Sequence, residues 1–207
     1  MDSITQLPPE SSCRRCGKAA DERLCAFCRV HPPEYDSAAS WTLYDGAARS
    51  LLHLYKYRRV LPAGTWFAAR LAPLLPASAE LLVPVPLARG RQRERGFNQS
   101  ELLARRLSRL THLPYDATGL ARRRETWTQA GLSREERERN VNGAFRVPEP
   151  RRIDGRSILL LDDVLTTGAT AQACALALKA AGAAAVHLLT IARADLDFAG
   201  RTLAGFA

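Results

Sequence analysis

One stretch constrains the fold of this 207-residue chain more than any other. Residues 158–161 are all apolar, and two carboxylates, Asp162 and Asp163, follow them directly. A short Thr/Gly loop comes next, and the Ala-rich segment after it predicts a helix. A buried strand that passes through a tight loop into a helix is the repeating unit of parallel sheets covered by helices.

The same stretch carries the groups that can hold a sugar phosphate. Loop amides and a helix N-terminus attract an anion, because unpaired N–H groups and the helix dipole converge there. Gly168 allows the backbone to approach a phosphate closely. Paired aspartates at the carboxyl end of a strand can accept hydrogen bonds from vicinal hydroxyls or hold a hydrated cation. A plain strand-to-helix turn would need only one capping residue.

Four apolar residues, Asp-Asp, two variable residues and Thr-Thr-Gly-Ala-Thr resemble the phosphoribosyl pyrophosphate (PRPP) motif of type I phosphoribosyltransferases. The resemblance implies a doubly wound, mostly parallel α/β sheet. It also implies catalytic roles for Asp162 and Asp163, which would fix the ribose hydroxyls and lend negative potential to a cation-like transition state. The implied ribose-5-phosphate site consists of both aspartates and Thr166, Thr167, Gly168, Ala169 and Thr170.

Four of the five cysteines form two closely spaced pairs, Cys13 with Cys16 and Cys25 with Cys28. Two residues between thiolates let both reach one ion from a tight turn, and two such turns complete a tetrahedral zinc site. Four thiolates leave no open coordination position, so the zinc is expected to be structural. The basic residues beside the first pair should favour thiolate formation. Two disulfides or a redox pair are the alternatives, and a cytosolic setting argues against disulfides.

Strand and helix patterns alternate along the rest of the chain, which favours the parallel, doubly wound sheet. Strands are expected near residues 39–44, 80–86, 116–122, 141–147 and 185–191, and helices near 47–57, 65–75 and 97–110. Residues 87–95 are expected to be loop, and 123–140 polar and mobile. The prolines of residues 31–34 form a natural linker. It divides a small zinc-ribbon-like module, residues 1–34, from a phosphoribosyltransferase-like domain, residues 35–207.

Two further stretches resemble the ComF family of competence-associated proteins, which includes GntX-type relatives. One is Pro84-Val85-Pro86 followed by residues 95–100, and the other spans residues 126–145. The four-cysteine front and residues 44–57 share the resemblance. It implies a role in natural transformation, namely import of single-stranded DNA into the cytosol. Single-stranded DNA and a competence helicase or other DNA-uptake proteins are the implied partners, besides PRPP.

The resemblance to type I transferases assigns two more regions. The loop after the second core strand would bind pyrophosphate, with Mg²⁺ neutralising it, through Pro86, Leu87, Ala88, Arg89 and Arg95. Residues 122–140 would form the hood that closes over PRPP, with Gln129, Arg137 and Asn140 as its polar positions. The segment from Ser133 also predicts an exposed helix with a capping box to Glu136. The two interpretations are compatible.

Three functions therefore stand side by side: a transferase of nucleotide or cofactor metabolism with an unknown acceptor, a PRPP sensor without turnover, and a DNA-uptake protein. The net charge of +9, nearly all from arginine, favours phosphates, nucleic acid or an acidic partner, although a merely solvated arginine surface would look the same. No apolar run approaches the length of a membrane span, and the N-terminus lacks signal-peptide features, so a cytoplasmic location is expected.

Overall fold

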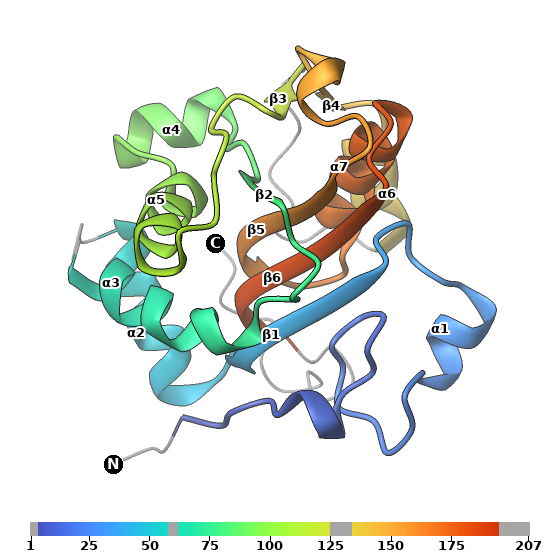
Figure 1. The fold of residues 1–207 in the computed structure, drawn as a ribbon. Coiled ribbons are helices and arrows are strands. Elements are labelled where there is room, and N and C mark those ends of the chain that lie inside the picture. Colours follow the sequence, from blue (N-terminus) through green and yellow to red (C-terminus); the bar gives the residue numbers. More distant parts are fainter. Residues whose placement is uncertain (1–3, 58–61, 125–133, 195–207) are drawn as a thin grey trace.

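The computed structural model describes residues 4–57, 62–124 and 134–194. Its centre is a four-stranded sheet in the order β1-β6-β5-β2 (Figure 1). The strands are β1 (Ser37–Leu43), β2 (Leu81–Pro84), β5 (Ser157–Leu165) and β6 (Ala185–Arg193). All three neighbouring pairs are parallel, so the carboxyl ends of the strands meet at one edge. The expected parallel sheet is confirmed.

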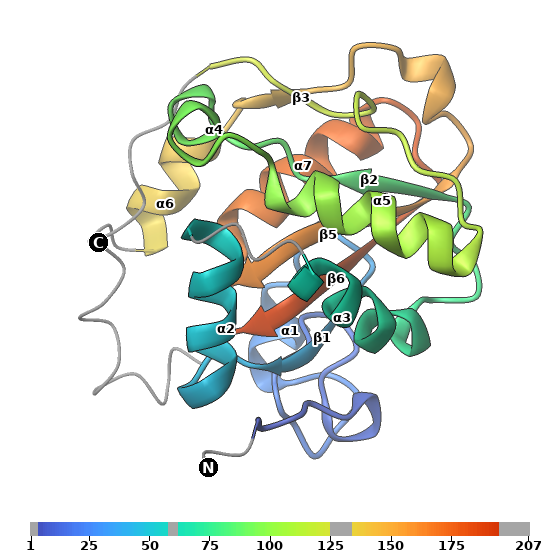
Figure 2. The same cartoon turned by 90° about the vertical axis from the view of Figure 1, so that its left-hand side faces the viewer.

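Helices cover both faces of this sheet. On one face lie α2 (Gly46–Tyr57), α3 (Pro62–Leu71) and α5 (Gln99–Thr111), and on the other lies α7 (Ala169–Ala180) (Figure 2). The alternation along β5 explains both layers: Ile158 and Leu160 pack with α7, whereas Leu159 and Leu161 pack with the other three helices. A strand that is apolar on both faces must be buried on both, which is the doubly wound arrangement.

The structure corrects two expected elements. Residues 89–95, expected as loop, form the helix α4 (Arg89–Arg95), which ends at Gly96 with a φ of 77°. The strand expected over 116–122 is reduced to β3 (Ala121–Arg122), and that over 141–147 to β4 (Phe145–Arg146). These two pair antiparallel with each other, outside the main sheet. The expected helical segment after residue 133 is present as α6 (Arg134–Val141).

Short 3₁₀ turns complete the elements: η1 (Pro9–Ser11), η2 (Ala72–Leu74) and η3 (Pro150–Arg152). η2 prolongs α3 toward the end of the expected 65–75 helix. Within the three described ranges, no helix has the length and apolar character needed to cross a membrane.

The cysteine-bearing segment packs directly against the outer strand β1. The Leu7 N–H donates to Trp41 O at 3.0 Å, and the Ala38 N–H donates to Arg14 O at 3.1 Å. Gly17 has a φ of +68°, and a Cβ there would lie 3.2 Å from Ala38 O. The one helix of the segment, α1 (Ala26–Val30), begins directly after Cys25. Backbone hydrogen bonds therefore join the segment to the sheet.

Candidate functional site: a carboxylate pair, a phosphate-type loop and a four-thiol cluster

Asp162 lies in β5, near the carboxyl end of the central part of the sheet. Its Oδ1 accepts hydrogen bonds from the Ser100 hydroxyl at 3.1 Å and from the Asp163 N–H at 2.9 Å. Burial, and after it the neighbouring Asp163 charge, raise the pKa of the Asp162 carboxyl from 3.8 to about 7, against the lowering effect of its hydrogen bonds and Lys56. A carboxyl with a pKa near neutral is poised to change charge when a ligand arrives.

Asp163 forms an ion pair with a lysine that lies far from it in the sequence. Lys56, in the last turn of α2, places its Nζ 3.1 Å from Asp163 Oδ1. Both side chains are 16% exposed, so the pair is shielded but still touched by solvent. The two carboxylates thus have different partners, a hydroxyl for Asp162 and a cation for Asp163.

The loop after β5 turns the chain sharply into α7. Gly168 precedes the first helical residue with a φ of 85°, in the left-handed region that favours glycine. A Cβ at Gly168 would lie 3.4 Å from the Tyr35 hydroxyl oxygen. Thr166, Thr167 and Thr170 are partly exposed and Ala169 is buried. The loop therefore presents its hydroxyls at the N-terminus of a twelve-residue helix, the arrangement that attracts anions.

The loop after β2 begins beside this carboxylate pair. The Val85 N–H donates to Leu161 O at 2.9 Å, and Asn98 Nδ2 donates to Val85 O at 3.1 Å. Asn98 is also the N-cap of α5, because its Oδ1 accepts from the Ser100 N–H. Pro86 and Leu87 are half-buried, Ala88 is buried, and the exposed Arg89 begins α4.

Arg95 lies at the end of α4, against α2. It is buried, with its guanidinium carbon 4.7 Å from the centre of the Tyr57 ring and Nη2 donating to the Tyr57 hydroxyl at 2.9 Å. These contacts join the end of α4 to the end of α2. Arg95 therefore supports the end of the helix that carries Lys56.

The three hood positions are described unequally. Gln129 lies outside the described residues. Arg137 lies within α6, and Asn140 is buried near the end of that helix. Val141 and Ala144, just beyond, pack in the core cluster that includes α7. The last turn of α6 is therefore fixed to the same helix that begins at the Thr/Gly loop.

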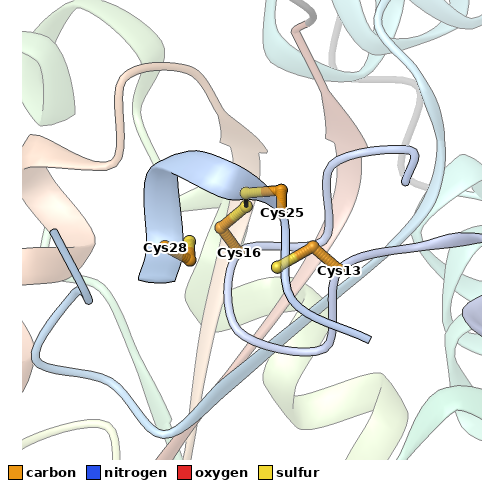
Figure 3. A group of neighbouring side chains, drawn as sticks. All are labelled: Cys13, Cys16, Cys25 and Cys28. Atoms are coloured by element: carbon orange, nitrogen blue, oxygen red, sulfur yellow. Dashed lines mark hydrogen bonds between the residues drawn. The ribbon is translucent and has the colours of Figure 1, made fainter. Parts of the chain in front are cut away.

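The four paired cysteines converge (Figure 3). Their sulfur atoms all lie within 4.8 Å of one another, and Cys16 Sγ lies 3.8 Å from Cys25 Sγ. Zn–S bonds of about 2.3 Å in a tetrahedron place sulfur atoms about 3.8 Å apart. All five cysteines are free thiols rather than disulfides, and the fifth, Cys174, is buried in α7, apart from the other four. The geometry of Cys13, Cys16, Cys25 and Cys28 fits one tetrahedral metal ion.

The cation that acts on these thiols was not the one expected. Arg15, between the first two cysteines, directs its guanidinium to Pro33 O in the linker and to Asp36 O just after the linker. Arg193, at the end of β6, donates instead to Cys16 O, and its charge lowers the pKa of Cys16 against the stronger raising effect of burial. Backbone hydrogen bonds outweigh burial at Cys13 and lower its pKa to about 7.

A cavity of about 290 Å³ lies between the cysteine segment and the Thr/Gly loop. The loop side contributes Thr166, Thr167, Gly168 and Ala169, and the cysteine side contributes Cys16, Cys25 and Cys28 among others. Tyr35 and Arg193 also line it. The cysteine motif and the Thr/Gly loop, which are far apart in the sequence, thus line one cavity.

Four residues of this region were not predicted as site residues from the sequence: Lys56, Ser100, Tyr35 and Arg193. Lys56 and Ser100 both lie within stretches that carry the family resemblance, and that was the available signal. Arg193 had none, because its position beside Cys16 depends on β6 lying next to β1 in the sheet.

A comparison with protein-family models found no match. Among solved structures, the chain is similar to glutamine PRPP amidotransferase from B. subtilis, with a TM-score of 0.45 and 23% identity over 63% of this chain and 26% of the other. It is also similar to hypoxanthine-guanine phosphoribosyltransferase from L. donovani, with a TM-score of 0.34 and 16% identity over 65% and 71% of the two chains.

Curated relatives are more similar in sequence. DNA utilization protein YhgH of Escherichia coli K12 is 35% identical, over 87% of this chain and 83% of the relative. Competence protein F of Haemophilus influenzae is 29% identical over 88% and 84%, and competence protein ComFC of Bacillus subtilis is 32% identical over 61% and 50%. The chain therefore belongs to the ComF family of competence-associated proteins.

Proposed function

We propose that the chain binds PRPP at the carboxyl edge of its sheet and serves in the uptake of single-stranded DNA into the cytosol. The proposal for the ligand rests on the pair Asp162–Asp163 in the last four residues of β5, followed by the loop with Gly168 in the left-handed region and by the start of α7. Carboxylates suit ribose hydroxyls, and the loop suits a 5′-phosphate. The carboxylates and the loop belong to one strand-loop-helix unit, so a single ligand that carries a ribose and a 5′-phosphate can contact both.

In this proposal Asp162 and Asp163 accept hydrogen bonds from the ribose hydroxyls. Lys56 orients Asp163, and Ser100 orients Asp162. Thr166 to Thr170 contribute hydroxyl and amide donors to the 5′-phosphate. Mg²⁺, bound together with PRPP, would neutralise the pyrophosphate.

The pyrophosphate would lie against the loop after β2. Val85 is fixed on both its N–H and its C=O, so Pro86, Leu87 and Ala88 start from a defined position next to β5. Arg89 at the start of α4 supplies the charged contact. Arg95 would contribute its positive charge to pyrophosphate binding. Its contacts with Tyr57 also hold the end of α4 against the end of α2. Gln129, Arg137 and Asn140 would belong to the hood.

The four cysteines would hold a structural Zn²⁺. Four thiolates complete its coordination and leave no position for a substrate. The ion would fix the two turns that carry Cys13–Cys16 and Cys25–Cys28 against β1.

The DNA role is supported by the names of the relatives, "DNA utilization protein" and "Competence protein". The net charge of +9 favours a polyanionic partner. A competence helicase or other DNA-uptake proteins are the proposed protein partners. The ligand is tested by calorimetric titration of the chain with PRPP and Mg²⁺, which should give saturable binding at one site. The DNA role is tested by binding of a labelled single strand at rising salt, where affinity should fall steeply and a flat response would contradict it.

A further inference from the structure

The cavity beside the Thr/Gly loop has one wall that the proposed PRPP site does not use. Its lining includes Thr166 to Ala169 from the loop, but neither Asp162 nor Asp163. Across from the loop it is lined by the cysteine segment and the linker, through residues that include Lys18, Phe27, His31 and Pro32. At about 290 Å³, it lies at the lower end of the range for small-molecule sites, about 300–1,000 Å³.

The wall of the cavity formed by the Thr/Gly loop is suited to a phosphate. Gly168 and the first turn of α7 lie there, and two cationic residues, Lys18 and Arg193, line the same space. Arg193 donates one N–H to Cys16 O, while its buried Nε has no hydrogen-bond partner among the described residues. Both cationic residues line the cavity, so their positive charges favour an anion held at the loop.

The wall formed by the cysteine segment is suited to a flat, apolar group. Phe27 lies in α1 and His31 is the residue that caps its C-terminus, with ring centroids 5.3 Å apart and the planes tilted by 43°. Phe27 is 45% exposed, although it is a large aromatic residue. Phe27 lies between Cys25 and Cys28 in sequence, so a metal ion bound by the four thiols would restrain the backbone that carries the ring. Exposed aromatic rings next to a basic groove are the usual platform for stacking bases.

We propose that this cavity binds a nucleoside 5′-phosphate. The phosphate lies at Thr166–Ala169, near Arg193 and Lys18, and the base stacks on Phe27 and His31. The inference rests on the proposed function for the phosphate loop, and it adds a base site on the cysteine segment. A free mononucleotide and the 5′-phosphorylated end of a single strand share this chemistry.

The test compares four ligands on the zinc-loaded chain: dTMP, oligo-dT with a 5′-phosphate, the same oligo-dT with a 5′-hydroxyl, and PRPP, which has no base. Phe27→Ala should weaken dTMP and the phosphorylated strand about tenfold, since stacking on one aromatic side chain is worth that order. PRPP binding should not change. Val30→Ala is the matched control, because Val30 lies on the same helix, is 71% exposed and does not line the cavity.

Zinc content, measured for each variant, shows that the module is intact, and Phe27→Trp should retain the affinity. Equal effects of Phe27→Ala and Val30→Ala would overturn the proposal, as would an equal loss of PRPP binding. Tight binding of the 5′-hydroxyl strand, equal to that of the phosphorylated strand, would also overturn it. Binding of the phosphorylated strand without dTMP assigns the site to a strand end, and similar affinities assign it to mononucleotides.

These measurements distinguish a failure of the base site from a failure of the PRPP site. If PRPP binds and neither base-bearing phosphate does, the base site is wrong and Lys18 and Arg193 only balance the thiolate charge. If PRPP fails to bind while the nucleotides bind with the expected Phe27 dependence, the proposed PRPP function is wrong and the base site stands. If nothing binds, both are wrong.

Discussion

Lys56 Nζ lies 3.1 Å from Asp163 Oδ1 and joins the end of α2 to the end of β5. The pair sits beside a second carboxyl, Asp162, whose pKa burial and Asp163 raise to about 7. Two carboxylates at neighbouring positions repel each other, and Lys56 offsets that repulsion. The carboxylate pair therefore costs stability in the folded chain, and Lys56 reduces that cost.

Lys56→Met should lower the free energy of unfolding by about 1–2 kcal/mol, because it leaves Asp163 without its cation in a partly shielded position. Urea denaturation measures the change. Arg105→Gln is the control, since it breaks the exposed pair with Glu101 and should cost less than about 0.5 kcal/mol. Equal losses in the two variants would contradict the structural role of Lys56.

The raised pKa of Asp162 predicts a pH dependence of stability. The folded pKa of about 7 exceeds the ordinary value of 3.8, so the folded protein binds a proton that the unfolded chain releases between these values. The favourable contribution of the protonated carboxyl is present below about pH 4 and is lost as the pH rises toward 7. Asp162→Asn should therefore gain stability relative to the parent across this window, by up to about 4 kcal/mol.

Denaturant unfolding of both proteins at several pH values measures this difference. A difference that stays flat between about pH 4 and pH 7 would show that the Asp162 pKa is ordinary.

Gly168→Ala should destabilise the chain by about 1–2 kcal/mol, because a φ of +85° is unfavourable for a residue with a Cβ. The new Cβ would also lie against the Tyr35 hydroxyl, so PRPP affinity should fall. Thermal unfolding and calorimetry measure the two effects. Gly90→Ala is the matched control, because its Cβ would meet nothing within 4 Å and the residue lies in a helix. That variant should be neutral or slightly stabilised.

One zinc ion per chain is expected from the four-thiol cluster. Cys28→Ser should lose most of the metal and lower the melting temperature, since metal binding there contributes to folding. Cys174→Ser is the control, because Cys174 is buried in α7 and lies outside the cluster. Elemental analysis of purified proteins measures the metal. Retention of a full equivalent by Cys28→Ser would remove this cysteine from the ligand set.

The unit from β5 to α7 could be predicted from sequence because its signals agree: four apolar residues, a glycine that must turn, and an Ala-rich helix. The same holds for the spacing of the cysteines. α4 could not, because Arg, Gln and Glu without apolar periodicity look like loop. The contacts of Lys56 with Asp163 and of Arg193 with Cys16 could not be predicted either. Each joins residues more than a hundred positions apart, so it depends on the tertiary fold.

The central claim is that Asp162 and Asp163 hold the ribose of PRPP. Its most direct test is a calorimetric titration with PRPP and Mg²⁺ of the parent and of the Asp162→Asn/Asp163→Asn double variant, with zinc content measured in both. The account predicts saturable binding to the parent, loss of binding in the double variant, and an unchanged zinc equivalent. Undiminished binding of PRPP by a double variant with its full zinc content would contradict it.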